Sequence, residues 1–126
     1  MDNTIRKAIE YAIVKDTATT LVAAGWTIRV WDGEIYHPRT ADIDAIMRVA
    51  FDTDDLQFDC TDASKYGFIS FVLGNGAEVI SDYSPNLDDL IDGLWCNRHY
   101  HTPEDADYST AYRVIKELFA GKESAS

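Results

Sequence analysis

Two short stretches of the sequence contain the residue types most suited to chemistry. Residues 51–62, FDTDDLQFDCTD, hold five aspartates and no basic residue: Asp52, Asp54, Asp55, Asp59 and Asp62. Residues 96–101, CNRHYH, hold Cys96, His99 and His101. Grouped carboxylates can coordinate calcium, remain solvated or contact a basic partner, whereas thiolate and imidazole groups are typical ligands of zinc.

The aspartate spacing fits a calcium loop only at its start. Asp52 and Asp54 have the spacing of the first two ligands of an EF-hand loop. Gln57 then stands where the invariant glycine belongs, and Ala63 stands where the bidentate glutamate belongs. The sequence therefore favours a solvated or partner-binding cluster over a calcium site.

The second stretch supplies three zinc-ligand types within six residues. A structural zinc site needs a fourth ligand, for which Cys60 or His37 remains. In the other interpretation Cys96 is a small core residue and the two histidines lie on a polar helix end. We expect no metal, and we keep a small zinc-binding protein as the alternative hypothesis.

The motifs give no support for nucleophilic catalysis. The chain contains no G-x-S-x-G nucleophile elbow. Gly74-Asn75-Gly76 suits a hairpin turn rather than a phosphate-binding loop. We therefore expect a protein that is not an enzyme and that has no cofactor.

The negative charge is confined to one part of the chain. The net charge is -11, from 22 acidic and 11 basic residues. Residues 52–107 hold 13 of the acids and only two bases, Lys65 and Arg98, while the rest holds nine of each. Nucleic acid and anionic membranes are poor direct partners for such a surface. A basic groove on a protein is a suitable partner for it.

Apolar periodicity and capping residues predict four helices. The first ends at Gly25, as a C′ glycine would, and its β-branched TATT run predicts a break near Asp16. Thr40 is the expected cap of the second helix, and Ser84-Pro85 opens the third. The expected ranges are 3–24, 41–51, 85–95 and 102–121.

Two turn signals predict antiparallel hairpins. Asp32-Gly33 within WTIRVWDGEIYH would place Val30 opposite Ile35. Asn75-Gly76 would place Phe71 opposite Ile80 and Val72 opposite Val79 in a hairpin over 66–84. Between them, 55–60 alternates as a strand with its acids facing solvent.

These elements predict an α+β fold with a mainly antiparallel sheet of about five strands and four helices. A chain of 126 residues, 46% of them hydrophobic, predicts one domain over 1–121 with a frayed tail over 122–126. MDNTIRKAIE lacks the features of a signal peptide, and the longest apolar run is too short to span a bilayer. We expect a location in the cytoplasm.

One face of the sheet is a candidate recognition surface. Its outward apolar side chains are expected from Trp31, Phe68, Val72 and Val79. Asp55 and Asp59 are expected to point the same way from the neighbouring strand. A helix covering this face is the competing expectation. If the face is open, aromatic anchors beside carboxylates suit a basic protein partner.

Two segments resemble a group of small phage and prophage proteins. They are AAGWTIRVWDGE (23–34) and FVLGNGAEVISDYS (71–84), and the resemblance extends from Gly25 to Leu94. It implies an accessory protein of a mobile element that acts in the cytoplasm of a bacterial host. Small acidic phage proteins of this kind are often inhibitors of host defence, including anti-restriction and anti-CRISPR proteins.

Together these features predict a non-enzymatic inhibitor that binds a host nucleic-acid-handling defence complex. Its carboxylates would occupy a groove built for phosphates, with neither nucleic acid nor membrane as a direct partner. The expected partner-binding residues are Asp52, Asp54, Asp55, Asp59, Asp88, Asp89, Asp92 and Trp31. Two alternatives remain: a zinc-binding protein using Cys96, His99 and His101, and a phage structural or assembly component.

Overall fold

The computed structural model of the chain describes residues 3–51, 55–74 and 79–94, with side chains at residue 7 and from residue 10 onward. Several expectations concern residues outside these ranges. They are the carboxylates of Asp52 and Asp54, the turn at Asn75-Gly76, the stretch CNRHYH with Cys96, His99 and His101, the helix over 102–121 and the tail over 122–126.

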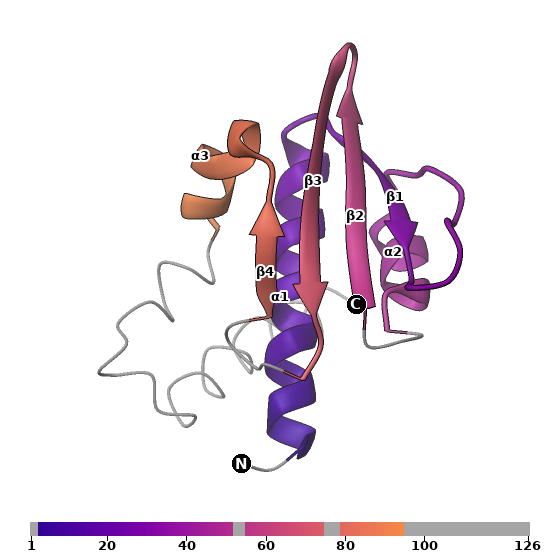
Figure 1. The fold of residues 1–126 in the computed structure, drawn as a ribbon, viewed down its shortest axis with the longest axis vertical. Helices are drawn as coiled ribbons and strands as arrows, with labels where there is room; N and C mark the ends of the chain where they lie inside the picture. The colour runs from indigo at the N-terminus through magenta and orange to yellow at the C-terminus, as the bar shows by residue number, and fades with distance from the viewer. Residues whose placement is uncertain (1–2, 52–54, 75–78, 95–126) are drawn as a thin grey trace, which may run out of the picture.

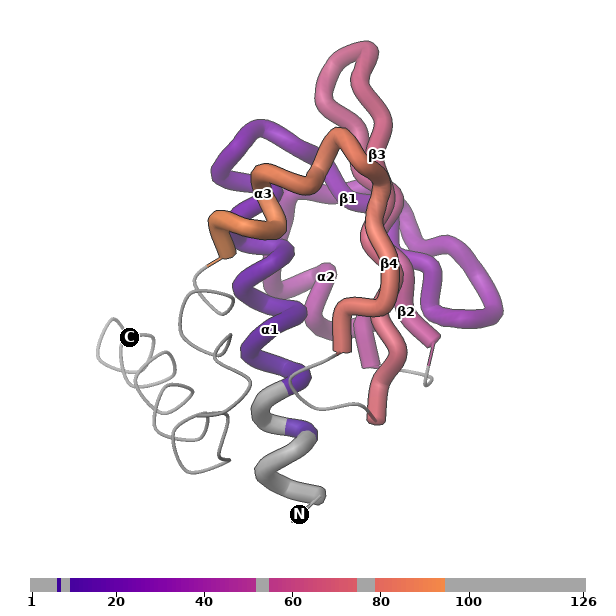
Figure 2. Tube along the Cα trace, turned by 60° about the vertical axis from the view of Figure 1, so that its left-hand side comes forward, coloured from indigo at the N-terminus to yellow at the C-terminus, as the bar shows by residue number. Residues whose placement is uncertain are grey.

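The described residues form an α+β fold around an antiparallel sheet of four strands (Figure 1). The strands are β1 (Thr27–Trp31), β2 (Asp55–Asp62), β3 (Lys65–Val72) and β4 (Ile80–Tyr83), and they are adjacent in that order. Helices α1 (Asn3–Ala23) and α2 (Ile43–Val49) lie on the same face of the sheet, as Figure 2 shows. The expected class is confirmed, with four strands rather than five in this part of the chain.

Helix α1 is continuous over 21 residues, so the expected break near Asp16 is wrong. The hydroxyl of Thr17 donates to the carbonyl of Ile13 at 2.7 Å, one turn earlier. This bond satisfies the hydroxyl within the helix, and Thr17 is fully buried. Packing of the buried side chains Val14 and Leu21 outweighs the weak helix propensity of the TATT run.

The end of α1 was correctly predicted at Gly25. Its φ of +99° is the left-handed conformation that a glycine adopts without steric cost. The amide of Gly25 donates to the carbonyl of Val22, and the amide of Trp26 donates to the carbonyl of Leu21, both at 3.0 Å. This pair of bonds is a Schellman motif, and it directs the chain into β1.

The first predicted hairpin is only partly formed. β1 pairs with β2, and residues 34–37 contribute a single bridge between Trp31 and Tyr36 instead of a strand. The expected register, with Val30 opposite Ile35, is therefore wrong. The Asp32 carboxylate widens the turn, because its Oδ1 accepts from the amides of Glu34 and Ile35 at 2.8 and 2.9 Å. Pro38, which has no amide hydrogen to donate, interrupts the pairing, and the chain bridges to β1 again at Thr40, opposite Ile28.

The second hairpin pairs as predicted. Phe71 lies opposite Ile80, and the amide of Val72 donates to the carbonyl of Val79 at 2.8 Å. β2 extends two residues beyond the expected range of 55–60 and pairs with β3 along its whole length. Ala63, with a φ of +52°, lies in the tight turn between β2 and β3.

The second and third helices are shorter than expected. Helix α2 is capped by Asp42, whose carboxylate accepts from the amides of Asp44 and Ala45. Thr40 does not cap it, because its backbone pairs with Ile28 of β1. The range expected for the third helix begins with a 3-10 turn, η2 (Pro85–Leu87), followed by α3 (Asp88–Asp92).

Ser84 links the chain to β3 instead of capping a helix. Its hydroxyl accepts from the amide of Phe68 at 3.0 Å and donates to the side chain of Asn86. Leu87 is buried directly over Gly67, where an added Cβ would lie 2.8 Å from the Leu87 Cδ1 atom. The glycine therefore lets η2 approach the strand closely.

The core lies between the sheet and the two longer helices. Phe58 and Phe71 meet edge to face on neighbouring strands, with ring centroids 4.9 Å apart. Glu10 of α1 is also buried, and its Oε2 accepts from the amide of Gly74 at 2.7 Å. This bond ties the first helix to the end of β3. None of the described helices is both long and apolar enough to cross a membrane.

Candidate protein-interaction surfaces

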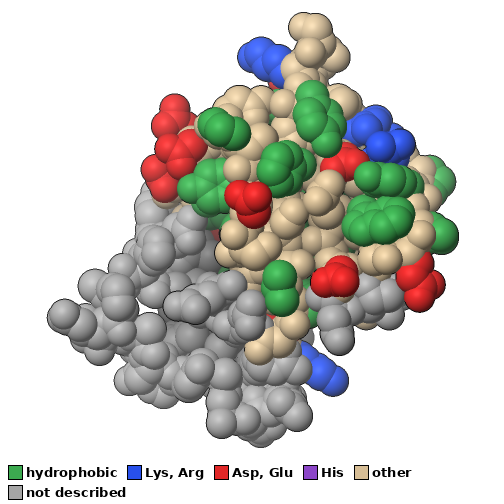
Figure 3. Space-filling view, viewed as in Figure 1, with side chains coloured by type: hydrophobic (Ala, Val, Ile, Leu, Met, Phe, Trp, Pro, Cys, Tyr) green, Lys and Arg blue, Asp and Glu red, His purple; other side chains and the backbone are tan. Residues whose placement is uncertain are grey.

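The sheet face opposite α1 and α2 is not covered by any helix of the described residues. Figure 3 shows this face, with hydrophobic side chains scattered among acidic ones. We call it the outer face and define it by strand alternation and pairing. Its residues are Thr27, Arg29 and Trp31 of β1, Asp55, Gln57, Asp59 and Thr61 of β2, Tyr66, Phe68, Ser70 and Val72 of β3, and Asp82 of β4.

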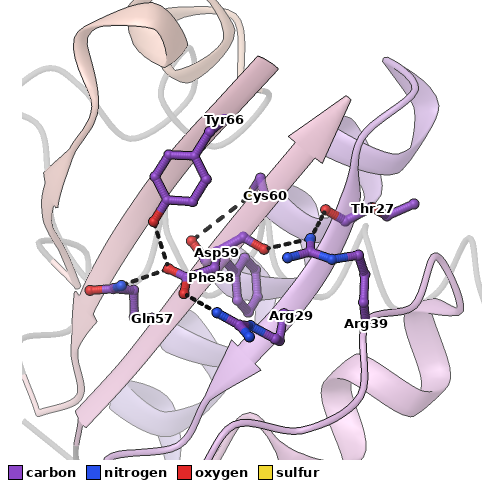
Figure 4. A network of polar contacts seen from close by, with 8 residues as sticks. All are labelled: Thr27, Arg29, Arg39, Gln57, Phe58, Asp59, Cys60 and Tyr66. Carbon is purple, nitrogen blue, oxygen red and sulfur yellow. Dashed lines mark hydrogen bonds and ion pairs between the residues drawn. The ribbon is translucent and has the colours of Figure 1, made fainter. Parts of the chain in front are cut away.

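Asp59 lies at the centre of the outer face and organises its polar contacts (Figure 4). Its Oδ1 accepts from the side-chain amide of Gln57 at 2.7 Å and from the hydroxyl of Tyr66 at 3.3 Å. Its Oδ2 forms an ion pair with Nη2 of Arg29 at 3.4 Å. Asp59 is only 2% exposed, so the expectation that it faces solvent is wrong.

Long neighbouring side chains account for the burial of Asp59. A carboxylate can leave water only if its oxygens gain other donors, and three side chains supply them. Arg39 holds the backbone next to this carboxylate, because its Nη1 donates to the carbonyls of Asp59 and Thr27, each at 3.2 Å. Asp59 is therefore a structural residue and not part of a free acidic surface.

The same cluster orients two aromatic side chains over β1. The guanidinium of Arg29 stacks on the ring of Tyr36 at 4.0 Å, and that ring lies 4.7 Å from the ring of Trp31. Trp31 is on the outer face, as expected, but it is half-buried. Of these two aromatic residues, Tyr36 is the more exposed, at 47%.

The β3 part of the outer face is apolar and exposed. Tyr66 is 55% exposed and Val72 is 40% exposed, with Phe68 between them half-buried. Burial, and then the nearby Asp59 carboxylate, raise the pKa of Tyr66, so its hydroxyl stays protonated and donates to Asp59. Val79 was expected on this surface, but it is fully buried.

Four exposed aspartates lie on β4 and α3, and we call them the acidic edge: Asp82, Asp88, Asp89 and Asp92. Several of these aspartates act on the side chain of Tyr83. Its hydroxyl donates to Oδ1 of Asp88 at 2.9 Å, and that bond is the main cause of its raised pKa. The charges of Asp88, Asp92 and Asp82 raise the pKa further, so at least three carboxylates act on one phenol.

The turn that carries Tyr36 is held by a second buried carboxylate. Asp32 is 6% exposed and accepts two backbone amides, and its Oδ2 lies 2.8 Å from Nε2 of His37. The backbone bond from Ile35 and then the bond to His37 lower the pKa of Asp32. The carboxylate is therefore ionised at neutral pH and fixes the turn.

The described residues contain no group of three or more His, Cys, Asp or Glu side chains that could hold a metal ion. The two residues considered as a fourth zinc ligand are both engaged. His37 pairs with Asp32, and Cys60 is buried in the core, where burial raises the pKa of its thiol to about 12. Cys60 therefore lacks the accessible thiolate that zinc binds, and His37 already has Asp32 as a partner.

The residues expected to bind a partner are thus divided among several places. Asp88, Asp89 and Asp92 lie together on α3, whereas Asp55 is exposed at the start of β2, opposite Val72. Asp59 and Trp31 belong to the outer-face cluster. Comparison with known proteins adds no further assignment: no protein-family model matches the chain, and no curated protein or solved structure is significantly similar to it.

Proposed function

We propose that the protein is a non-enzymatic binding protein whose acidic edge occupies a basic, nucleic-acid-binding groove of a protein partner. The main support is the grouping of four exposed aspartates on β4 and α3, where the hydroxyl of Tyr83 donates to Oδ1 of Asp88 at 2.9 Å. Carboxylates that act jointly on one phenol create a local negative potential, which a basic groove would neutralise.

The spacing of the carboxylates suits this role. Asp88 and Asp92 are four residues apart on a helix, so their Cβ atoms are separated by about 5–6 Å on one side of α3. A DNA strand carries one charge per ~3.4 Å of helix axis, which is the same order of spacing. Residues 66–97 contain no Lys, Arg or His that could neutralise this charge from within the segment.

The proposed partner is a host complex that handles nucleic acid in defence against phages. The resemblance of segments 23–34 and 71–84 to phage and prophage proteins supports this context, and the net charge of -11 disfavours nucleic acid itself as the ligand. The protein would act by exclusion: a groove filled by carboxylates cannot bind phosphates. It needs no catalytic residue and no cofactor for this.

Competition for nucleic acid provides the test. Purified host restriction and CRISPR effector complexes are titrated with the protein, and the release of a labelled duplex DNA is followed by fluorescence anisotropy. We expect release from at least one complex, with an affinity that falls on the order of tenfold or more between about 50 and 200 mM salt. Affinity that does not change with salt would contradict an electrostatic mimic.

A matched pair of variants separates the acidic edge from general acidity. Asp88→Asn/Asp92→Asn and Glu34→Gln/Asp44→Asn each remove two negative charges from exposed side chains. We expect only the first variant to weaken release of DNA, while both keep the melting temperature of the wild type within a few degrees. Equal weakening by the two variants would mean that net charge alone, and not this edge, governs binding.

A further inference from the structure

We infer that the centre of the outer face binds a carboxylate group of a protein partner through Arg29 and Arg39. This site takes a ligand of the opposite charge to that of the basic groove, so it goes beyond the proposed function. One guanidinium group comes from β1 and the other from the segment between β1 and α2. Both contact Asp59 of β2, as Figure 4 shows.

Both guanidinium groups are held in place by contacts within the fold. Nη1 of Arg39 donates to the carbonyls of Thr27 and Asp59, each at 3.2 Å, so it bridges two strands. Nη2 of Arg29 pairs with Oδ2 of Asp59 at 3.4 Å, and the same guanidinium stacks on the ring of Tyr36 at 4.0 Å. Side chains that are already ordered lose little conformational entropy when a ligand binds.

The positive charge of the two arginines exceeds the negative charge beside them on the outer face. Asp59 lies directly opposite Arg29, and the next carboxylate of this face, Asp55, is four residues further along β2. One carboxylate therefore balances only one of two guanidinium groups, although the whole protein has a net charge of -11. The other neighbours of Arg29 on β1 and β2 of this face are uncharged: Thr27, Trp31, Gln57 and Thr61.

Both arginines keep donors that a ligand can use. The side chain of Arg29 is 42% exposed, and Arg39 is exposed as well. A guanidinium has five N–H donors, and the contacts with Thr27 and Asp59 use only one nitrogen of each group. Nε of Arg29 has no acceptor among the described residues, so Asp59 does not saturate this guanidinium.

The charge of the protein favours a carboxylate over a phosphate as the ligand. Arginine donors match the oxygens of either group. A phosphate monoester carries a charge of about −1.5 to −2 at pH 7, so a protein of net charge -11 repels it more strongly than a single carboxylate. The exposed ring of Tyr36 offers apolar contact to the residues that flank a carboxylate in a protein segment. Tyrosine and arginine are enriched at protein interfaces.

An NMR titration of the full chain with two short peptides tests this inference. Both peptides are acetylated and amidated; one alternates three glutamates with two valines, and the other has glutamine in place of glutamate. We expect the glutamate peptide to bind about threefold or more tightly, with a preference that weakens between about 50 and 300 mM salt. It should shift the backbone amide signals of Thr27, Arg29, Arg39 and Asp59.

Matched variants separate this site from net charge and from the acidic edge. Arg39→Gln should abolish the preference for glutamate, whereas Arg48→Gln, which removes the same charge from an exposed arginine of α2, should not. Asp88→Asn/Asp92→Asn should keep the preference. The signals that shift in the wild type locate the site by themselves, so the inference stays testable even if Arg39→Gln does not fold.

Three results would overturn the inference. The first is equal binding of the two peptides, or shifts confined to residues outside the outer face. The second is an equal loss of preference in Arg39→Gln and Arg48→Gln, because net charge alone would then govern binding. The third comes from inorganic phosphate as the second oxyanion: tighter binding of phosphate at the same amide signals would contradict the assignment to a carboxylate. The DNA-release experiment does not depend on any of these results.

Discussion

At the scale of single residues, the neighbours of a carboxylate decide whether it supports the fold or is available to a partner. Asp59 is enclosed by Gln57, Tyr66 and Arg29, whereas Asp88 is exposed and has the Tyr83 hydroxyl as a donor. The sequence places both in one acidic segment and gives no sign of this difference. Cross-strand partners create it, and these are fixed only when β2 has paired on both sides.

We expect Asp59→Asn to destabilise the fold by about 1–3 kcal/mol, because Arg29 loses its ion pair and one buried donor is left without an acceptor. Urea unfolding followed by circular dichroism measures this change. Asp55→Asn on the same strand and face is the matched control and should change stability by less than about 0.5 kcal/mol. Equal stabilities for the two variants would show that the Asp59 contacts contribute nothing.

The raised pKa of Tyr83 gives a second test at this scale. Asp88→Asn removes the charged acceptor of the tyrosine hydroxyl, so the pKa of Tyr83 should move down towards its ordinary value of 10.0. A titration followed by NMR of tyrosine labelled with ¹³C at Cζ measures it. Asp89→Asn removes a neighbouring charge that does not act on Tyr83, and it should leave this pKa nearly unchanged. An unaltered pKa in Asp88→Asn would contradict the contact between Tyr83 and Asp88.

At the scale of elements, the predictions were right where backbone conformation and strand pairing determine the structure. They were wrong where a side chain binds the backbone of a turn. Gly25 ended α1 as expected because only a left-handed residue fits there, and the Phe71–Ile80 pairing followed from the hairpin pattern. The first hairpin failed because the Asp32 carboxylate binds two amides of the turn and widens it. The cap of α2 is Asp42 instead of Thr40, because the backbone of Thr40 pairs with Ile28 of β1.

The turn at Asp32 should make stability depend on pH in the acid range. The pKa of Asp32 is lowered in the folded state, so its ionisation stabilises the fold above the unfolded pKa of about 3.9. This contribution is lost as the pH falls through the lower folded pKa. Asp32→Asn, which keeps an acceptor oxygen, should therefore be less stable than the wild type at pH 7, with a difference that shrinks towards pH 3 in urea unfolding. A constant difference would contradict this assignment, and Glu34→Gln serves as the exposed control.

The contact between η2 and β3 predicts that Gly67→Ala destabilises the protein by about 1–3 kcal/mol. The new Cβ would lie 2.8 Å from Cδ1 and 3.0 Å from Cγ of Leu87, a buried side chain with little room to move. Gly93→Ala is the control, since its Cβ would meet only ordinary contacts at 3.4 Å or more. Thermal unfolding by calorimetry compares them, and similar melting temperatures would show that η2 shifts without cost.

At the scale of the whole molecule, the sequence locates charge along the chain but not in space. The sequence places 13 acids in segment 52–107 without showing whether they share a face, and the described ones are divided among the outer face, the acidic edge and a buried site. The residues of the outer face were foreseen from strand alternation, with Trp31 among them, but whether a helix covers this face was left open. The exposed aromatic Tyr66 was not foreseen, because its position depends on Asp59 of the neighbouring strand.

The buried bond between Glu10 and Gly74 also bears on how fast the chain folds and unfolds. The β2–β3 and β3–β4 pairings close short loops and the β1–β2 pairing joins residues 26 to 34 positions apart, whereas this bond joins residues 64 positions apart. Because closing the longest loop costs the most chain entropy, we expect this contact to form after the transition state. Glu10→Gln should therefore accelerate unfolding and leave the refolding rate nearly unchanged in stopped-flow kinetics. The bond between the first helix and the end of β3 would then slow unfolding and lengthen the lifetime of the native state.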